Sequence, residues 1–119
     1  MRTPSPTVLV VDDDSSIRFL CRLNLGFAGW TVREADTLDE ARRQLADRAV
    51  DVVLLDVHVG SENGAVLLDE IRRAYPRTKV AMLTGSTGTH ALDGVQPDRV
   101  IGKPFTLDEL TGTARALAG

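Results

Sequence analysis

The segment 8–14 reads Val-Leu-Val-Val-Asp-Asp-Asp, so that four apolar residues lead directly into three carboxylates. Three later apolar runs also lead into a polar residue, at Asp56, at Thr84 and at Lys103. Short runs rich in β-branched residues are typical of strands that are buried on both faces. In an open parallel sheet, ligands bind outside the carboxyl ends of the strands. We therefore expect a cluster that suits a divalent cation and a phosphoryl group, made of Asp12, Asp13, Asp56, Thr84 and Lys103.

Apolar runs and helical patterns alternate along the chain, which is typical of a βαβ series. This alternation predicts a single α/β domain with a doubly wound, parallel sheet of five strands. The expected strands cover residues 8–11, 30–35, 52–56, 79–83 and 99–102.

The helices between these strands have recognisable starts and apolar faces. We expect Asp14 or Ser15 to cap the first helix. A capping-box spacing at Thr37 and another at Thr106 predict the starts of the second and the last helix. Pro76 should end the third helix. The predicted apolar faces comprise Ile17, Leu20, Cys21, Leu25 and Ala28, then Leu38, Ala41, Leu45 and Ala49, then Leu67, Leu68, Ile71 and Tyr75.

One of the expected helices has a weak sequence pattern. The stretch 85–97, where a fourth helix is due, contains three glycines and a proline. Each interior glycine costs a helix about 1 kcal/mol relative to alanine. We expect a shortened or irregular fourth helix, with about one turn over residues 89–93.

Composition and charge exclude several classes of protein. The chain is 43% hydrophobic and 26% charged, which is ordinary for a globular domain, and its net charge of -3 argues against direct binding of nucleic acid. No apolar run approaches the roughly 20 residues that span a bilayer. Cys21 is the only cysteine, which fits a reducing cytoplasm, and Cys21 and Trp30 are expected to pack in the core. We expect a cytoplasmic monomer or weak dimer.

Taken in order, four motifs resemble the receiver domain of two-component response regulators, the family of the bacterial chemotaxis regulator. They are Val-Val-Asp-Asp-Asp at 10–14, Leu-Leu-Asp-Val-His-Val at 54–59, Met-Leu-Thr-Gly at 82–85 and Gly-Lys-Pro-Phe at 102–105. The resemblance implies a flavodoxin-like (βα)5 fold over residues 8–118, preceded by a flexible lead at 1–7. It also implies a phosphoacceptor module rather than an enzyme.

The resemblance assigns a role to each residue of the cluster. Asp56 would accept a phosphoryl group from a sensor histidine kinase or a phosphotransfer protein, and an unidentified protein would receive the signal. Mg²⁺, or Mn²⁺ in its place, would be held by Asp12, Asp13, Asp56 and the backbone carbonyl of His58. The phosphoryl oxygens and the conformational switch would involve Thr84, Gly85 and Lys103.

Some positions depart from the family pattern. Val100 stands where an aromatic switch residue is frequent, and Gly60 stands where proline is common. His58 and Ser86 would flank the route of an attacking water and would tune the lifetime of the phosphorylated state. The bond between Lys103 and Pro104 is often cis in the family.

Other functions fit parts of the same pattern. Asp12 to Ser16 also resembles the first motif of haloacid-dehalogenase-type phosphatases, although Asp56 would then have no role. A pseudo-receiver, which docks partners without being phosphorylated, is a second alternative. Because the chain begins with Met1, we expect a stand-alone receiver, with a fragment of a longer regulator or hybrid kinase as the alternative.

Overall fold

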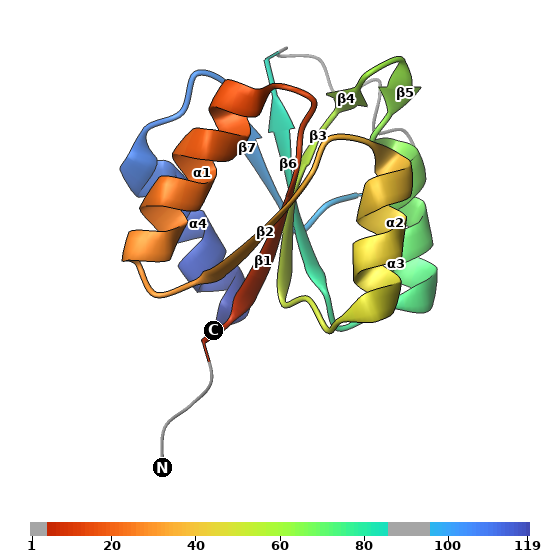
Figure 1. Cartoon of the computed structure of the whole chain (residues 1–119), viewed down its shortest axis with the longest axis horizontal. Helices are drawn as coiled ribbons and strands as arrows, with labels where there is room; N and C mark the ends of the chain where they lie inside the picture. Colours follow the sequence, from red (N-terminus) through yellow and green to blue (C-terminus); the bar gives the residue numbers. More distant parts are fainter. Residues whose placement is uncertain (1–4, 86–95) are drawn as a thin grey trace.

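The computed structural model describes residues 5–85 and 96–119, and its centre is a parallel sheet of five strands with the order β2-β1-β3-β6-β7 (Figure 1). Each neighbouring pair of strands in this sheet is parallel, so that the carboxyl ends of all five lie at one edge. The strands are β1 (Thr7–Val11), β2 (Thr31–Ala35), β3 (Val52–Asp56), β6 (Lys79–Thr84) and β7 (Arg99–Gly102). The predicted doubly wound parallel fold is therefore confirmed.

Two helices cover each face of the sheet. One face carries α1 (Ser15–Phe27) and α4 (Leu107–Ala118), and the other carries α2 (Leu38–Asp47) and α3 (Ala65–Ala74) (Figure 1). This is the expected consequence of strands that are apolar on both faces, because each face must be shielded from water.

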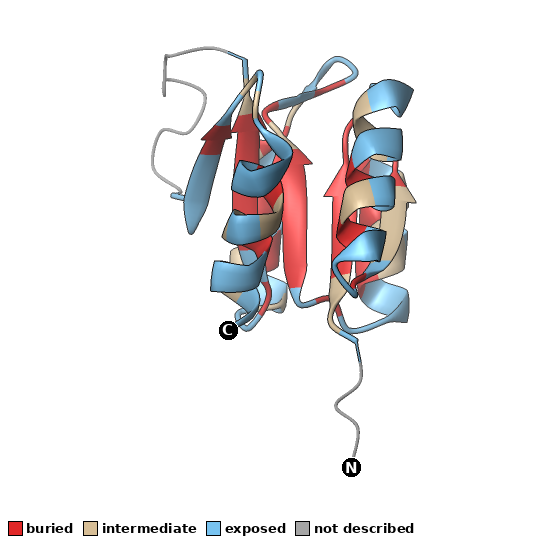
Figure 2. Ribbon diagram, turned by 90° about the vertical axis from the view of Figure 1, so that its left-hand side faces the viewer, coloured by how far each residue is buried: buried red, intermediate tan, exposed pale blue. Residues whose placement is uncertain are grey.

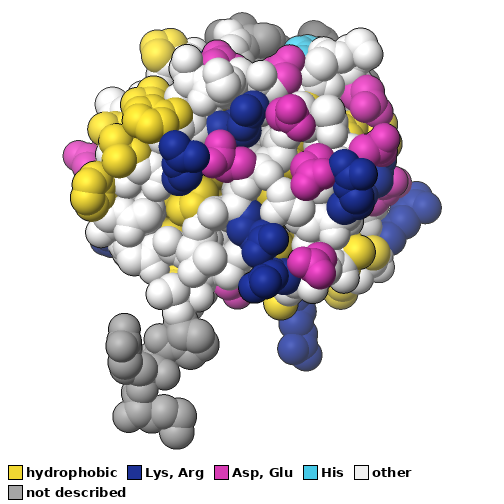
Figure 3. Space-filling model, viewed as in Figure 1, with side chains coloured by type: hydrophobic (Ala, Val, Ile, Leu, Met, Phe, Trp, Pro, Cys, Tyr) yellow, Lys and Arg dark blue, Asp and Glu magenta, His cyan; other side chains and the backbone are white. Residues whose placement is uncertain are grey.

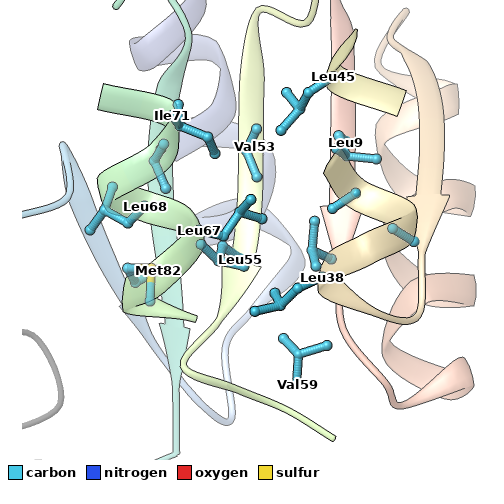
Figure 4. Packing of buried hydrophobic residues seen from close by; sticks show 14 of the residues in the cluster. Leu9, Leu38, Leu45, Val53, Leu55, Val59, Leu67, Leu68, Ile71 and Met82 are labelled. Atoms are coloured by element: carbon cyan, nitrogen blue, oxygen red, sulfur yellow. The ribbon is translucent and has the colours of Figure 1, made fainter. Parts of the chain in front are cut away.

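The core is split by the sheet into two layers. The layer under α2 and α3 includes Leu38, Leu45, Leu67 and Ile71, packed on the inner residues of β1, β3 and β6 (Figure 4). The layer under α1 and α4 is built around Cys21, Leu25, Trp30 and Leu110, which confirms the packing predicted for Cys21 and Trp30. Figure 2 shows the buried strands lying between helices whose outer faces are exposed. Burying one Leu or Val side chain contributes about 1.5–3 kcal/mol, so these layers are the main source of stability.

Side-chain caps fix where three helices begin. The Asp14 carboxylate accepts from the backbone N–H groups of Ser16 and Ile17, so Asp14 rather than Ser15 caps α1. The capping box at Thr106 is complete, because the Glu109 carboxylate also accepts from the Thr106 N–H. At Thr37 only half of the predicted box forms: its hydroxyl accepts from the Glu40 N–H.

Three predicted core residues are exposed. Leu20 is 41% exposed, Ala28 lies beyond the last residue of α1, and Ala49 lies in the loop after α2, where Val50 is buried instead. The outer face of α1 is in fact apolar: hydrophobic side chains gather on that side of the molecule (Figure 3), and the exposed ones on α1 are Phe19, Leu20, Leu23 and Phe27. The predicted apolar face of this helix was wrong at Leu20 and Ala28 because the helix carries apolar residues on more than one of its sides.

The segment between β3 and α3 contains a small antiparallel ribbon. Its strands are β4 (His58–Val59) and β5 (Glu62–Asn63), with Gly60 and Ser61 between them. Val59 is buried, and it anchors the ribbon in the core under α2 and α3. The ribbon extends beyond the carboxyl edge of the sheet (Figure 1).

Two further expectations concern residues 85–104. The peptide bond between Lys103 and Pro104 is cis. The irregular fourth helix expected over residues 85–97 lies almost entirely outside the described residues. None of the described helices combines the length and the hydropathy that a membrane-spanning helix requires.

Candidate functional site

The parallel register brings four strand ends to one edge of the sheet. Asp12 follows β1, Asp56 ends β3, Thr84 ends β6 and Lys103 follows β7. The strands that carry Asp12 and Asp56 are direct neighbours, as are the strands that lead to Thr84 and Lys103. The clustering predicted from the apolar runs is thus what the fold produces.

Lys103 joins the two inner carboxylates. Its Nζ lies 3.0 Å from Asp12 Oδ2 and 3.5 Å from Asp56 Oδ2. Burial lowers the pKa of the Lys103 ammonium, but its contacts with the two carboxylates outweigh burial and raise that pKa above its usual value. Lys103 therefore carries a fixed positive charge at neutral pH.

Asp12 is fully buried but fully satisfied. Besides Lys103, its carboxylate accepts from the Asp14 N–H at 2.9 Å. Its backbone carbonyl accepts from Arg18 Nη1 at 2.7 Å, and the same guanidinium pairs with Glu34 on β2. These contacts hold the turn between β1 and α1 in place.

Asp56 lies at the boundary between the core and solvent, with 14% of its side chain exposed. Burial and the nearby charge of Asp12 raise the pKa of the Asp56 carboxyl, while Lys103 and the His58 N–H, 3.4 Å from Asp56 Oδ1, oppose that shift. The ionised form of Asp56 is thus disfavoured by its surroundings, and a further cation would stabilise it.

Asp13 is exposed, and its environment differs from that of Asp12. Its Oδ2 accepts from the backbone N–H of Gly60 at 3.0 Å. Asp12, Asp13 and Asp56 each offer a carboxylate oxygen, and these oxygens lie within 4.8 Å of one another. Oxygen donors at this spacing fit a hard divalent cation such as Mg²⁺, which is bound through one or two carboxylates and several waters.

The remaining predicted residues surround this cluster. Thr84 is partly buried, and its backbone carbonyl accepts from the Lys103 N–H at 2.7 Å, so the two residues are tied together. Gly85 and His58 are exposed. Val100 is 50% exposed on β7, and Ser86 lies outside the described residues.

Two residues of the site were missed from the sequence. A Cβ at Gly64 would lie 2.2 Å from the Asp56 backbone carbonyl, so only glycine permits this approach of α3 to β3. Arg18 is the other, through its bond to the Asp12 carbonyl. A glycine placed directly before an apolar helix was a usable signal for Gly64, whereas nothing in the spacing of Arg18 identified a partner.

Comparison with known proteins agrees with this geometry. The profile of the response regulator receiver domain matches residues 8–115. This chain belongs to the response regulator receiver family. Receiver domains are phosphoacceptor modules of two-component signalling and not classical enzymes, and they interact with sensor kinases or phosphotransfer proteins.

Several relatives of this receiver domain are larger proteins. The DNA-binding transcriptional regulator NtrC of Salmonella typhimurium is 32% identical over 105 residues, which are 86% of this chain and 22% of that protein. Response regulator MprA of Mycobacterium ulcerans is 33% identical over 117 residues, which are 95% of this chain and 50% of that protein. The receiver domain thus spans between about a fifth and a half of the length of these two relatives.

Solved structures show the same fold. The receiver domain of NtrX from Brucella abortus is 34% identical with a TM-score of 0.83, covering 93% of this chain and 97% of that one. Chemotaxis response regulator CheY4 of Vibrio cholerae is 28% identical with a TM-score of 0.87, covering 95% of this chain and 98% of that one.

Proposed function

We propose that Asp56 accepts a phosphoryl group from a phosphohistidine on a sensor kinase or phosphotransfer protein, with the help of Mg²⁺. The observation that carries this proposal is the position of Asp56, between the Lys103 ammonium and two further carboxylates at one sheet edge. Residues 8–118 would form the folded unit that does this, as a monomer or weak dimer in the cytoplasm.

The chemistry follows from the residue types. One Asp56 carboxylate oxygen forms a bond to phosphorus, the bond between phosphorus and the histidine nitrogen breaks, and the imidazole leaves with the electron pair. Two like unit charges about 4 Å apart repel by about 4 kcal/mol at an effective dielectric of 20. Lys103 would offset part of that repulsion, and a loose transition state requires mainly such positioning and charge stabilisation.

The cation would be held by Asp13, with Asp12, Asp56 and the backbone carbonyl of His58 completing the protein ligands. When bound, Mg²⁺ supplies positive charge that stabilises the charge of the transferred phosphoryl group. Mn²⁺ has the same preference for oxygen and could take its place.

The signal would leave through the face formed by Thr84, Gly85 and Lys103. The bond between the Thr84 carbonyl and the Lys103 N–H couples the ends of β6 and β7. A phosphoryl group that draws in both the Thr84 hydroxyl and the Lys103 ammonium would shift this pair together. Because Val100 has no aromatic ring, the switch would not depend on an aromatic rotamer there. His58, and Ser86 beyond the described segment, would tune how long the phosphoryl group persists.

Phosphorylation by a small donor tests the proposal. Incubation with acetyl phosphate and Mg²⁺ should add the mass of one phosphoryl group, acid-labile in the manner of an acyl phosphate. Asp56→Asn should abolish the addition, while Asp36→Asn, at an exposed aspartate after β2, should retain it.

Two other outcomes would favour the alternatives. A chain that never gains phosphate would be a pseudo-receiver, for which the absent aromatic at Val100 is the supporting observation. In a separate assay, continuous hydrolysis of a phosphomonoester would instead favour the phosphatase hypothesis.

A further inference from the structure

We propose that the β4–β5 ribbon is a positioning element for the cation site, and that the backbone N–H of Gly60 holds the Asp13 carboxylate in its binding orientation. This inference rests on the proposed role of Asp13 as a cation ligand. It adds a residue, Gly60, whose contribution comes from its backbone and which the strand-end pattern does not reveal.

The ribbon presents this N–H because of the kind of turn that it makes. His58 pairs with Asn63 and Val59 pairs with Glu62, which leaves a two-residue connection at Gly60 and Ser61. The φ angle of Gly60 is 63°, and within the described segments only glycines have a positive φ. A turn with glycine in this conformation at its first central position is of type II′. The N–H at that position takes no part in the ladder, so it is free to donate to Asp13, and it does so at 3.0 Å.

The ribbon is anchored at three points, so its N–H is held in place before any ligand arrives. Val59 is 2% exposed and packs in the core under α2 and α3. The Gly64 N–H donates to the Val57 carbonyl at 2.6 Å, and Gly64 itself lies directly against the Asp56 backbone. At the start of α3, the Asn63 side chain accepts from the Ala65 N–H at 2.9 Å.

Asp13 needs such a partner more than its neighbours do. Asp12 and Asp56 are both oriented by Lys103, but Asp13 forms no ion pair within the described segments and is exposed to water. A carboxylate has about four lone-pair sites, so one bond from Gly60 fixes its orientation and leaves capacity for a cation. Partners of this kind, which orient a metal ligand without touching the metal, commonly change metal affinity about 10- to 100-fold.

The ribbon also contacts Asp56, the proposed phosphoacceptor. The His58 N–H lies 3.4 Å from Asp56 Oδ1, so a six-residue segment touches two of the three carboxylates through backbone donors. Its effect on the site should therefore survive substitution of its exposed side chains, such as Ser61 and Glu62, and depend on the backbone at Gly60.

Nuclear magnetic resonance of the full chain tests the contact itself. In Asp13→Ala without metal, exchange of the Gly60 amide proton should accelerate at least about tenfold and its resonance should shift, because its acceptor is gone. The amide protons of Val59 and Glu62 should keep their wild-type exchange rates if the ribbon persists. An unchanged Gly60 amide would overturn the inference, and this arm requires no variant of the ribbon.

Titration with Mg²⁺, followed at the backbone amides of residues 12–14 and 56, tests the consequence. Gly60→Pro removes the N–H and also changes the turn, because proline fixes φ at about −65°, so it should weaken Mg²⁺ binding about tenfold. Gly60→Asn keeps the N–H and tolerates positive φ, so it should stay within about twofold of the wild type. Ser61→Ala is the matched control on the same turn, and unfolding followed by circular dichroism reports any general loss of structure.

The outcomes separate the two proposals. Wild-type affinity in a folded Gly60→Pro variant would refute the positioning role and leave the Mg²⁺ site intact. A wild-type chain that binds no Mg²⁺ would refute the site and the positioning role together. Should Gly60→Pro fail to fold, Gly60→Ala, which keeps the N–H but strains the turn, should show weaker binding than Gly60→Asn, and equal affinity in these two variants would also refute the role.

Discussion

Asp12 and Asp13 are neighbours in the chain, yet they lie on opposite sides of the acidic cluster. The inner side, formed by Asp12, Asp56 and Lys103, is buried or nearly so, and Lys103 pairs with both carboxylates, at 3.0 and 3.5 Å. The outer side consists of Asp13 and the Gly60 N–H, and it faces water. The difference teaches that the chain supplies its own cation, Lys103, to the two inner carboxylates, whereas the outer carboxylate forms no ion pair within the described segments.

The largest effect on labelling is expected when the inner side loses its positive charge, the Lys103 ammonium. Lys103→Met should slow labelling by acetyl phosphate about 100-fold or more, because loss of one charge-stabilising donor typically costs that much. Lys79→Met is the matched control, since Lys79 is the only other lysine and is exposed at the far end of β6. Labelling of Lys103→Met at a rate within threefold of wild type would break the comparison.

A second substitution tests whether the two sides share one rigid support. Gly64→Ala would place a Cβ 2.2 Å from the Asp56 carbonyl, and crowding of this kind costs about 1–3 kcal/mol of unfolding free energy. Gly112→Ala in α4 meets no atom within 4 Å and should instead stabilise the protein by up to about 1 kcal/mol. Denaturant unfolding measures both, and equal stabilities would show that the close approach at Gly64 is dispensable.

On the outer side, Asp13→Asn should reduce Mg²⁺ affinity about tenfold, because a charged oxygen ligand becomes neutral. The exposed position of Asp13 predicts that the metal-free unfolding midpoint stays unchanged. Calorimetric titration gives the affinity. A large loss of stability in this variant would mean that the outer side is structural rather than functional.

The inner side should also respond to pH. Because the pKa of Asp56 is raised in the folded state, the folded protein retains a proton that the unfolded chain has already lost. Metal-free stability should therefore be greatest below the ordinary carboxyl pKa, as far as Asp56 is concerned, and fall as pH rises through the folded-state value. Asp56→Asn should remove this component, as seen in unfolding midpoints measured between pH 4 and pH 8 in a chelator. An identical pH profile in both proteins would contradict it.

The smallest effect is expected at Thr84. Thr84→Ala removes one uncharged donor to the phosphoryl group; at the lower end of the range for hydrogen bonds to charged groups, about 1.5 kcal/mol, labelling should slow about tenfold. Thr84→Ser keeps the hydroxyl and should recover the wild-type rate. A loss of labelling rate as large as that of Lys103→Met would mean that Thr84 contributes as much to the reaction as Lys103 on the inner side.

Much of the inner side could be predicted from the sequence, because strand ends in a parallel sheet are a topological property. Knowing that apolar runs end at Asp12, Asp56, Thr84 and Lys103 was enough to place these residues at one edge. The Asp14 cap was also predictable, since a short carboxylate before a helix has a local partner.

The outer side could not be predicted in the same way. Strands of two residues carry no period, so β4 and β5 gave no signal, although a glycine and a serine between two short extended pairs fit a hairpin turn. The misplaced residues Leu20 and Ala28 have a related cause. Phe19, Leu23 and Phe27 are apolar yet exposed, so hydrophobicity alone did not distinguish the buried side of α1.

Trp30 lies just before β2, at the opposite edge of the sheet from the acidic cluster, and it is 9% exposed. As the only tryptophan, it is the sole source of indole emission in this protein. Its fluorescence should therefore follow global unfolding while staying silent to cations or phosphate at the other end, so the protein carries a built-in optical reporter of folding that is independent of signalling.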